Sequence, residues 1–270
     1  MALAEAAPHS AAGGNDVGIR RSLDGERLLA VFSKLVEPLG RSMPATSEVV
    51  LHDLSLLPNS IIAIHGNVTG RVVGDPATDL LLERLSRRDG ADSHLNYETV
   101  LPDGRRLRSS TMIIRDVAGN PAAALCINTD TSAWETVELV ARAVLGRLDP
   151  EELETLQFAR PVEPAQVPEA PAAAARPSQR ETFVRDIDEL AKVILTRAID
   201  ETGVPVELMH KRHKVEVVRQ LEERGLFLLK DAVELAAQAL QVTRFTIYNY
   251  LNEIHDQDDH DNRKAPHEVR

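Results

Sequence analysis

The stretch "AQALQVTRFTIYNYL", residues 237–251, predicts two helices joined by a connection of only a few residues. Helices joined this tightly cross at a steep angle, which requires small residues where they touch, and Ala236 and Ala237 supply them. The apolar residues spaced to fill the wedge between the two helices are Leu240, Val242, Ile247 and Leu251. The stretch therefore predicts a crossed helix pair with a buried apolar wedge.

Polar and aromatic side chains gather at the start of the second helix of this pair. Thr243 stands where an N-cap hydroxyl accepts a hydrogen bond from a free backbone N–H group. The pattern resembles the DNA-binding helix-turn-helix, whose second helix places its N-terminal residues at base edges in the major groove. Arginine pairs with guanine and asparagine with adenine, so we expect double-stranded DNA as the partner. The candidate DNA-binding residues are Thr243, Arg244, Phe245, Thr246, Tyr248 and Asn249.

Two features of this segment leave an alternative open. Gln241 occupies the turn position where glycine is commonest, and a positive φ there would cost about 1 kcal/mol. Residues 207–253 contain seven Lys or Arg and seven Asp or Glu, so this region is not basic. Similar helix pairs occur in domains that bind only protein. The alternative function is therefore a metabolite-binding protein whose helical domain contacts other proteins.

Prolines divide the chain into two blocks. The stretch "RPVEPAQVPEAPAAAARPSQR", residues 160–180, holds five prolines and almost no large apolar residue. Proline removes backbone donors and favours an extended chain, so this stretch predicts a semi-rigid linker. The predicted organisation is a flexible tail at 1–20, a sensor domain at 21–157, a linker at 158–180, a DNA-binding domain at 181–256 and a second flexible tail at 257–270.

The first block mixes strand and helix periodicity. Strands are predicted in "SEVVLHDL", "SIIAIHG", "LNYETVL", "RLRSSTMIIRD" and "AAALCINTD", and the turn residues between them indicate antiparallel pairing. Helices are predicted over 24–39, 76–90 and 131–148, the last beginning with a capping box of Ser132 and Glu135. The second block predicts helices over 186–203, 207–225, 228–240 and 243–254. The fold class is therefore α+β, an antiparallel sheet with flanking helices followed by an all-α domain.

Longer stretches of the first block carry a family resemblance. The segments "VVLHDL" (49–54), "SIIAIHGNVTGRVVGDPATDL" (60–80), "LNYETVLPDGRRLRSSTMIIRD" (95–116) and "LCINTD" (125–130) resemble the YheO-like PAS domain. The second block resembles the helix-turn-helix domain that accompanies it, in transcriptional regulators similar to the D-arginine utilisation repressor. The resemblance covers residues from about 21 to 255. It implies a PAS-like sensor that controls a DNA-binding repressor, with a possible role in arginine-type amino-acid metabolism.

A PAS-like sensor encloses its ligand between the sheet and flanking helices, in an apolar wall with a few polar groups. The candidate ligand-binding residues are Asn96, Tyr97, Ser110, Asn128 and Asp130. Side chains alternate along a strand, so Ser109 and Ser110 face opposite ways, and the pattern leaves open which of them looks inward. Asp130 or Glu98 would pair with a cationic amino acid. The alternative is that these residues make hydrogen bonds at strand edges or turns.

Composition limits the remaining possibilities. The net charge of −11 argues against non-specific adhesion to nucleic acid or anionic membrane but permits a local DNA-binding face. The single cysteine fits a reducing compartment, and no apolar run approaches the roughly 20 residues that span a bilayer. We therefore expect a soluble, cytoplasmic protein that does not bind membranes.

No nucleophile, base and orienting group can be assembled from the sequence, so we expect neither an enzyme nor a bound metal or cofactor. Helix-turn-helix proteins commonly dimerise to match paired half-sites, so we expect a homodimer or a higher homo-oligomer. The apolar face of "DIDELAKVILTRAID", residues 186–200, suits such an interface. The same face would equally suit the core of its own domain.

Overall fold

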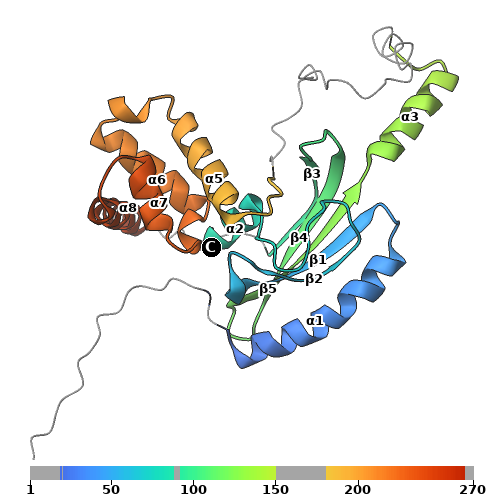
Figure 1. Ribbon diagram of the computed structural model, residues 1–270, viewed down its shortest axis with the longest axis horizontal. Coiled ribbons are helices and arrows are strands. Elements are labelled where there is room, and N and C mark those ends of the chain that lie inside the picture. Colours follow the sequence, from blue (N-terminus) through green and yellow to red (C-terminus); the bar gives the residue numbers. More distant parts are fainter. Residues whose placement is uncertain (1–18, 20, 88–91, 150–180, 265–270) are drawn as a thin grey trace, which may run out of the picture.

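The computed structural model describes residues 19, 21–87, 92–149 and 181–264 of the chain. It has the expected α+β fold, with an antiparallel sheet in its N-terminal half and a group of helices beside the sheet (Figure 1). The linker predicted at 158–180 and nearly all of the tail predicted at 1–20 lie outside the described residues. In the described part of the chain, no helix combines the length and apolar character needed to cross a membrane.

Five antiparallel strands form the sheet, in the order β2-β1-β5-β4-β3. They are β1 (Ser47–Asp53), β2 (Ile61–His65), β3 (Ser93–Val100), β4 (Arg106–Arg115) and β5 (Pro121–Asp130). Strands β3, β4 and β5 follow one another as the predicted meander. Strand β1 pairs with both β2 and β5, and all of its residues are buried. The hairpin of β1 and β2 therefore completes the sheet beside the meander.

Helix α1 (Leu23–Ser42) lies along one face of the sheet (Figure 1). Its apolar stripe packs on the sheet, because Leu29 and Val36 share a buried cluster with Val49, Leu51 and Ala123. Burying each such aliphatic side chain contributes about 1.5–3 kcal/mol. This apolar layer defines the α1 face and leaves the opposite face for other contacts.

Helix α3 (Ser132–Val144) continues from β5 and projects away from the sheet, with none of its residues buried (Figure 1). The capping box predicted for it is wrong. Thr131 is the N-cap and Ser132 is already helical, so the Ser132 hydroxyl cannot cap the first turn. The Ser132 backbone N–H instead donates to Asp130 Oδ1 at 2.9 Å, and the Thr131 hydroxyl donates to Glu135 Oε1 at 3.2 Å.

The helical half contains α5 (Ile187–Glu201), α6 (Lys211–Glu223), α7 (Ala232–Ala239) and α8 (Arg244–Lys264). The helix predicted from residue 207 begins only at Lys211, because Val206–Leu208 form a 3₁₀ turn. The helix predicted from 228 begins at Ala232, after Asp231 takes a φ of 59° that no α-helix continues through. Helix α8 extends to Lys264, beyond residue 257, where the second tail was expected to begin.

One hydrophobic cluster joins the two halves of the molecule. Leu81 and Leu82 of α2 (Asp79–Ser86) belong to the same buried cluster as Leu190 of α5 and Leu221 of α6. The buried residues of α5 are Leu190, Ala191, Ile194 and Ala198, so its apolar face covers this core. Helix α2 therefore packs on the sheet side and on the helical side at once.

Gly225 lies at a close approach between the two halves. It ends α6 with a φ of 73°, as the glycine at a helix stop is expected to do. A Cβ at this position would lie 2.5 Å from the carbonyl oxygen of Leu82 and 2.7 Å from Ser86 Oγ. The backbone of α2 leaves no room for a side chain here.

We expect Gly225→Ala to destabilise the protein more than Gly203→Ala. Both glycines follow a helix with a positive φ, so both substitutions carry a backbone cost of roughly 1–2 kcal/mol. A Cβ at Gly203 meets nothing within 4 Å, whereas at Gly225 it adds an overpacking cost of about 1–3 kcal/mol. Urea denaturation of the two variants measures the difference. Equal losses would show that α2 does not touch the end of α6.

Candidate functional site

The turn between α7 and α8 has the geometry that the sequence predicts. Ala236 and Ala237 are buried where the helices cross, and the Val242 backbone N–H donates to the Ala237 carbonyl at 2.9 Å. Gln241 takes a φ of 53°, the left-handed conformation expected at this turn. The Lys214 ammonium of α6 donates to the Leu240 carbonyl at 2.8 Å, which closes the end of α7. Helices α6, α7 and α8 therefore all contribute to holding the turn.

Helix α8 begins with a side-chain cap and then divides into two faces. The Thr243 hydroxyl accepts from the Thr246 backbone N–H at 3.2 Å. Ile247 and Tyr250 are buried, at 0% and 7% exposure, whereas Phe245 and Tyr248 are 72% and 52% exposed. Of the candidate DNA-binding residues, Thr246 is half-buried and the exposed ones are Thr243, Arg244, Phe245, Tyr248 and Asn249.

Arg244 pairs with α7 across the turn. Its Nη1 lies 3.0 Å from Glu234 Oε2, and its side chain is 68% exposed. A surface ion pair of this kind contributes at most about 1 kcal/mol, whereas a bidentate arginine–guanine contact contributes about 1–3 kcal/mol. The pair therefore does not prevent Arg244 from turning towards a base.

The sheet has a polar face opposite α1. Ser109 and Thr111 of β4 lie on it, whereas Ser110 lies between them on the α1 face. The Ser109 hydroxyl donates to Asn128 Oδ1 at 2.9 Å, and Asn128 Nδ2 donates to Glu48 Oε1 at 3.3 Å. The sequence left open whether Ser109 or Ser110 faces inward, and the structure buries Ser109 on the polar face.

The predicted ligand-binding residues divide between three places. Tyr97 and Asn128 are both buried on the polar face. Asp130, at the end of β5, pairs with Arg105 Nη1 at 3.2 Å. Asn96 is exposed at an irregularity of β3 with a φ of 56°, and its backbone N–H donates to Ser110 Oγ at 3.0 Å. The structure brings Tyr97 and Asn128 to one face and places Asn96 and Ser110 away from it.

A buried carboxylate from outside the sheet completes this polar face. Glu181, which precedes α5, accepts hydrogen bonds from the Thr78 hydroxyl at 2.8 Å and from the Tyr97 hydroxyl at 3.1 Å. Burial raises the pKa of Glu181 to about 7, although the Thr78 hydrogen bond and the Arg71 guanidinium act against this rise. Burial and the neighbouring Glu181 also raise the pKa of Tyr97. The phenol therefore stays protonated and donates to the carboxylate.

Arg71 is the cation of this region. It is 4% exposed, its Nε donates to Thr69 Oγ1 at 3.2 Å, and its guanidinium lies 5.0 Å from the centre of the Phe183 ring. Its Nη1 is buried and has no hydrogen-bond partner in the described part of the chain. A buried guanidinium nitrogen with a free donor suits an additional anionic or carbonyl oxygen.

Comparison with known proteins agrees with both parts of this geometry. Residues 24–146 match the YheO-like PAS domain family, and residues 190–252 match an HTH domain. The chain is 27% identical over 230 residues to "Uncharacterized protein YheO" of Escherichia coli K12, a match that covers 84% of this chain and 85% of the relative. It is 31% identical over 210 residues to "Transcriptional regulator DauR" of Pseudomonas aeruginosa, over 77% of this chain and 85% of the relative.

The chain belongs to the YheO-like family of transcriptional regulators. It is a regulator that combines a PAS-like domain with a helix-turn-helix (HTH) domain, which confirms the resemblance found in the sequence. No solved structure gives a significant match.

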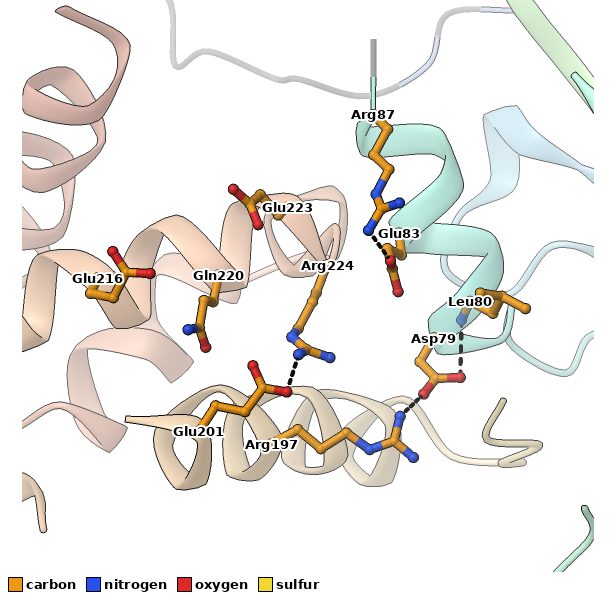
Figure 2. Close-up of a pocket in the computed structure, with 10 residues that line it drawn as sticks. All are labelled: Asp79, Leu80, Glu83, Arg87, Arg197, Glu201, Glu216, Gln220, Glu223 and Arg224. Carbon is orange, nitrogen blue, oxygen red and sulfur yellow. Dashed lines mark hydrogen bonds and ion pairs between the residues drawn. The ribbon is translucent and has the colours of Figure 1, made fainter. Parts of the chain in front are cut away.

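A cleft of about 460 Å³ lies between α2 of the PAS domain and α5 and α6 of the HTH domain (Figure 2). Its lining residues are Asp79, Leu80, Glu83, Arg87, Arg197, Glu201, Glu216, Gln220, Glu223 and Arg224. Figure 2 shows each of its three arginines directed at a carboxylate. The pair of Arg197 and Asp79 joins the two domains across the cleft, with Asp79 largely buried and Arg197 one third exposed.

Sequence reasoning missed Glu181, Thr78 and Arg71. Each is a single polar residue in a turn or connection, where no periodic pattern distinguishes a buried side chain from an exposed one. The available signal was the pair Phe183 and Val184, the first large apolar residues to follow the proline-rich stretch. Apolar residues before a predicted helix indicate that the chain is already packed at that point.

We expect Phe245→Ala and Ile247→Ala to separate the two faces of α8. Phe245 is mostly exposed, so its truncation should change the free energy of unfolding by no more than about 0.5 kcal/mol. Ile247 is fully buried, and its truncation should cost about 2–5 kcal/mol. Chemical denaturation measures both. A large loss for Phe245→Ala would mean that this ring is part of the core.

We expect Glu181 to make the protein less stable as pH rises from about 4.5 to about 7, since its pKa is raised on folding and the folded state holds the proton over that range. The groups that face it are Arg71, Asp79 and Tyr97. At 1.36 kcal/mol per pKa unit, the loss relative to Glu181→Gln is up to roughly 3 kcal/mol. Denaturation of both proteins across this pH range measures it.

The relevant quantity is the difference in unfolding free energy between wild type and Glu181→Gln, because His52 changes the stability of each with pH in the opposite direction. Burial lowers the pKa of His52 to about 3, so this residue favours folding less as pH falls below its usual pKa of 6.5. His52 is present in both proteins and cancels in the comparison. Parallel stability curves for wild type and Glu181→Gln would show that Glu181 does not titrate in the fold.

Proposed function

We propose that this regulator is a repressor whose DNA affinity changes when a small molecule binds the PAS domain. The exposed rings of Phe245 and Tyr248, beside the buried Ile247 and Tyr250, are the observation that supports DNA reading by α8. The resemblance to the D-arginine utilisation repressor supports an amino-acid effector of arginine type and a role in that metabolism. The proposal includes no catalytic activity and no metal or cofactor.

The roles proposed at the DNA follow from the side-chain chemistry. Arg244 pairs with guanine, Asn249 with adenine, and Phe245 contacts a thymine methyl group. The hydroxyls of Thr243 and Tyr248 contact phosphate oxygens, which fix the position of the helix on the duplex. Thr246 is the sixth residue of the proposed DNA-binding set.

The proposed effector site is the polar face of the sheet. Tyr97 and Asn128 support this placement because both are buried there. Asp130 follows Asn128 on the same side of β5 and is the candidate partner of a cationic group. The outlying Asn96 and Ser110 are candidates only for contacts at the strand edge.

We propose that the regulator acts as a homodimer or a higher homo-oligomer. Operator half-sites lie one helical turn apart, which a two-fold symmetric pair of reading helices matches. Helix α3 supports this proposal with exposed apolar side chains, among them Trp134, Val137 and Val144, which are 64%, 57% and 83% exposed. The α5 face that the sequence offered as an alternative is already used in the core.

The proposed function predicts that Arg244→Ala weakens binding to the operator by about 1–3 kcal/mol and relaxes its sequence preference. The operator is recovered first, as genomic DNA fragments bound by the full-length protein. Affinities for that site and for scrambled DNA are then measured by fluorescence anisotropy at several salt concentrations. Arg87→Ala is the matched control, because Arg87 also makes a surface pair with a single glutamate but lies at the C-cap of α2.

Binding through phosphates should weaken steeply as salt concentration rises. An unchanged operator affinity for Arg244→Ala would contradict the assignment of the reading helix. Absence of any salt-dependent DNA binding would favour the alternative, a metabolite-binding protein whose helical domain contacts other proteins.

A further inference from the structure

The residues that enter α5 are packed in the PAS domain. Glu181 and Val184 are 7% and 5% exposed. Phe183 packs against the cluster of Val68, Leu101 and Leu107, all of which belong to the PAS domain. The segment 181–183 therefore packs against the PAS domain before the chain reaches its own helical domain, whose core Val184 joins.

The groups that receive the Glu181 carboxylate all come from the PAS domain. Thr78 is the N-cap of α2 and donates to Oε1, while Tyr97 of β3 donates to Oε2. Arg71, from the loop after β2, acts on the carboxylate through its charge without a hydrogen bond to it, and in the described part of the chain it keeps one buried nitrogen without a partner. A hydroxyl and a phenol that donate to one carboxylate, with a guanidinium nearby that keeps a free donor, are the groups expected of a carboxylate-binding site.

We propose that Thr78, Tyr97 and Arg71 form a site for the carboxylate of a small organic acid, and that Glu181 of the same chain occupies this site in the present conformation. The inference rests on the proposed ligand response and gives the chemical class of the effector. A free acid and Glu181 compete for the same donors, so binding of one requires release of the other.

Release of Glu181 would loosen the contact between the domains. Asp79 follows Thr78 directly, and it accepts from the Thr182 backbone N–H at 2.6 Å and pairs with Arg197 of α5. Thr182 follows Glu181, so movement of this segment out of the site would break the hydrogen bond between Thr182 and Asp79. The occupant of the carboxylate site is thereby linked to the position of α5 and of the HTH domain.

An occupant on the same chain competes strongly, because tethering gives it an effective concentration on the order of millimolar or more. The full-length Glu181→Ala variant removes this competitor and leaves space for the missing CH₂–COO⁻ group. Acetate fills that space and serves as the probe. Calorimetry or the shift of the unfolding temperature measures its binding.

We expect acetate to bind Glu181→Ala at least about tenfold more tightly than wild type. Acetamide, which has the same shape without the charge, should show no such gain. Adding Arg71→Gln to Glu181→Ala should abolish the gain, because the cation is then missing. The control Glu37→Ala makes the same substitution elsewhere in the PAS domain, at an α1 side chain that is 64% exposed, and should match wild type.

Acetate affinity of Glu181→Ala equal to that of wild type and Glu37→Ala would overturn the proposal. If Glu181→Ala does not fold, Glu181→Gln replaces it, because the amide keeps the shape and loses the charge. Acetate should then bind Glu181→Gln several-fold more tightly than wild type, and equal binding would again overturn the proposal.

A separate measurement distinguishes this inference from the proposed function. Operator affinity is compared between wild type and the Glu181 variant, each with and without acetate. A carboxylate site that binds acetate without any change in operator affinity would leave the site established and contradict the ligand response. If acetate does not bind the Glu181 variant but the protein still binds its operator, only the proposed carboxylate site is contradicted.

Discussion

Leu81 and Leu82 of α2 are buried in one cluster with Leu221 of α6 and Leu226, so a helix of the PAS domain supplies part of the core of the HTH domain. Each of these leucines contributes about 1.5–3 kcal/mol through burial, which makes the contact between the domains comparable to an ordinary core. Gly225 permits this approach because it has no side chain. The position of the helical domain is therefore tied to the PAS domain by packing.

Two buried glutamates contact the polar side of the sheet and have different environments, Glu48 of β1 and Glu181 from the segment before α5. Glu48 accepts from the backbone N–H groups of Val68 and Thr69 and from the Thr69 hydroxyl, a donor set that compensates a buried charge well. Glu181 has only two hydroxyl donors, and its pKa is raised to about 7. The carboxylate that contacts both domains thus has fewer hydrogen-bond donors than Glu48, which suits the exchange proposed for it.

Helix α8 follows a constrained turn and has an exposed face. Gln241 holds a left-handed conformation at a cost of about 1 kcal/mol, which the hydrogen bonds of Lys214 and Val242 around the turn offset. Ile247 and Tyr250 anchor α8 in the core, so the residues between them project outwards. Exposed aromatic rings on so firmly held a helix indicate a surface used for recognition.

Periodicity and turn chemistry in the sequence were enough to predict the strands, most of the helices and the crossing of α7 and α8. These features depend on residues within one turn or one hairpin, such as Ala237, Thr243 and Gly225, and local patterns record them well. The beginnings of α6 and α7 were predicted too early, because the short 3₁₀ turns before them have the same apolar composition as a helix.

Contacts between distant residues were not recorded in any local pattern. Burial of Glu181 depends on Thr78 and Tyr97, which lie 103 and 84 positions away in the chain. Which side of β4 carries the buried polar residues likewise depended on which side α1 covered. Alternation of side chains along a strand does not by itself distinguish the two sides. Amino-acid order alone thus settled the elements and the family, whereas folding in three dimensions settled which polar groups lost water and gained partners.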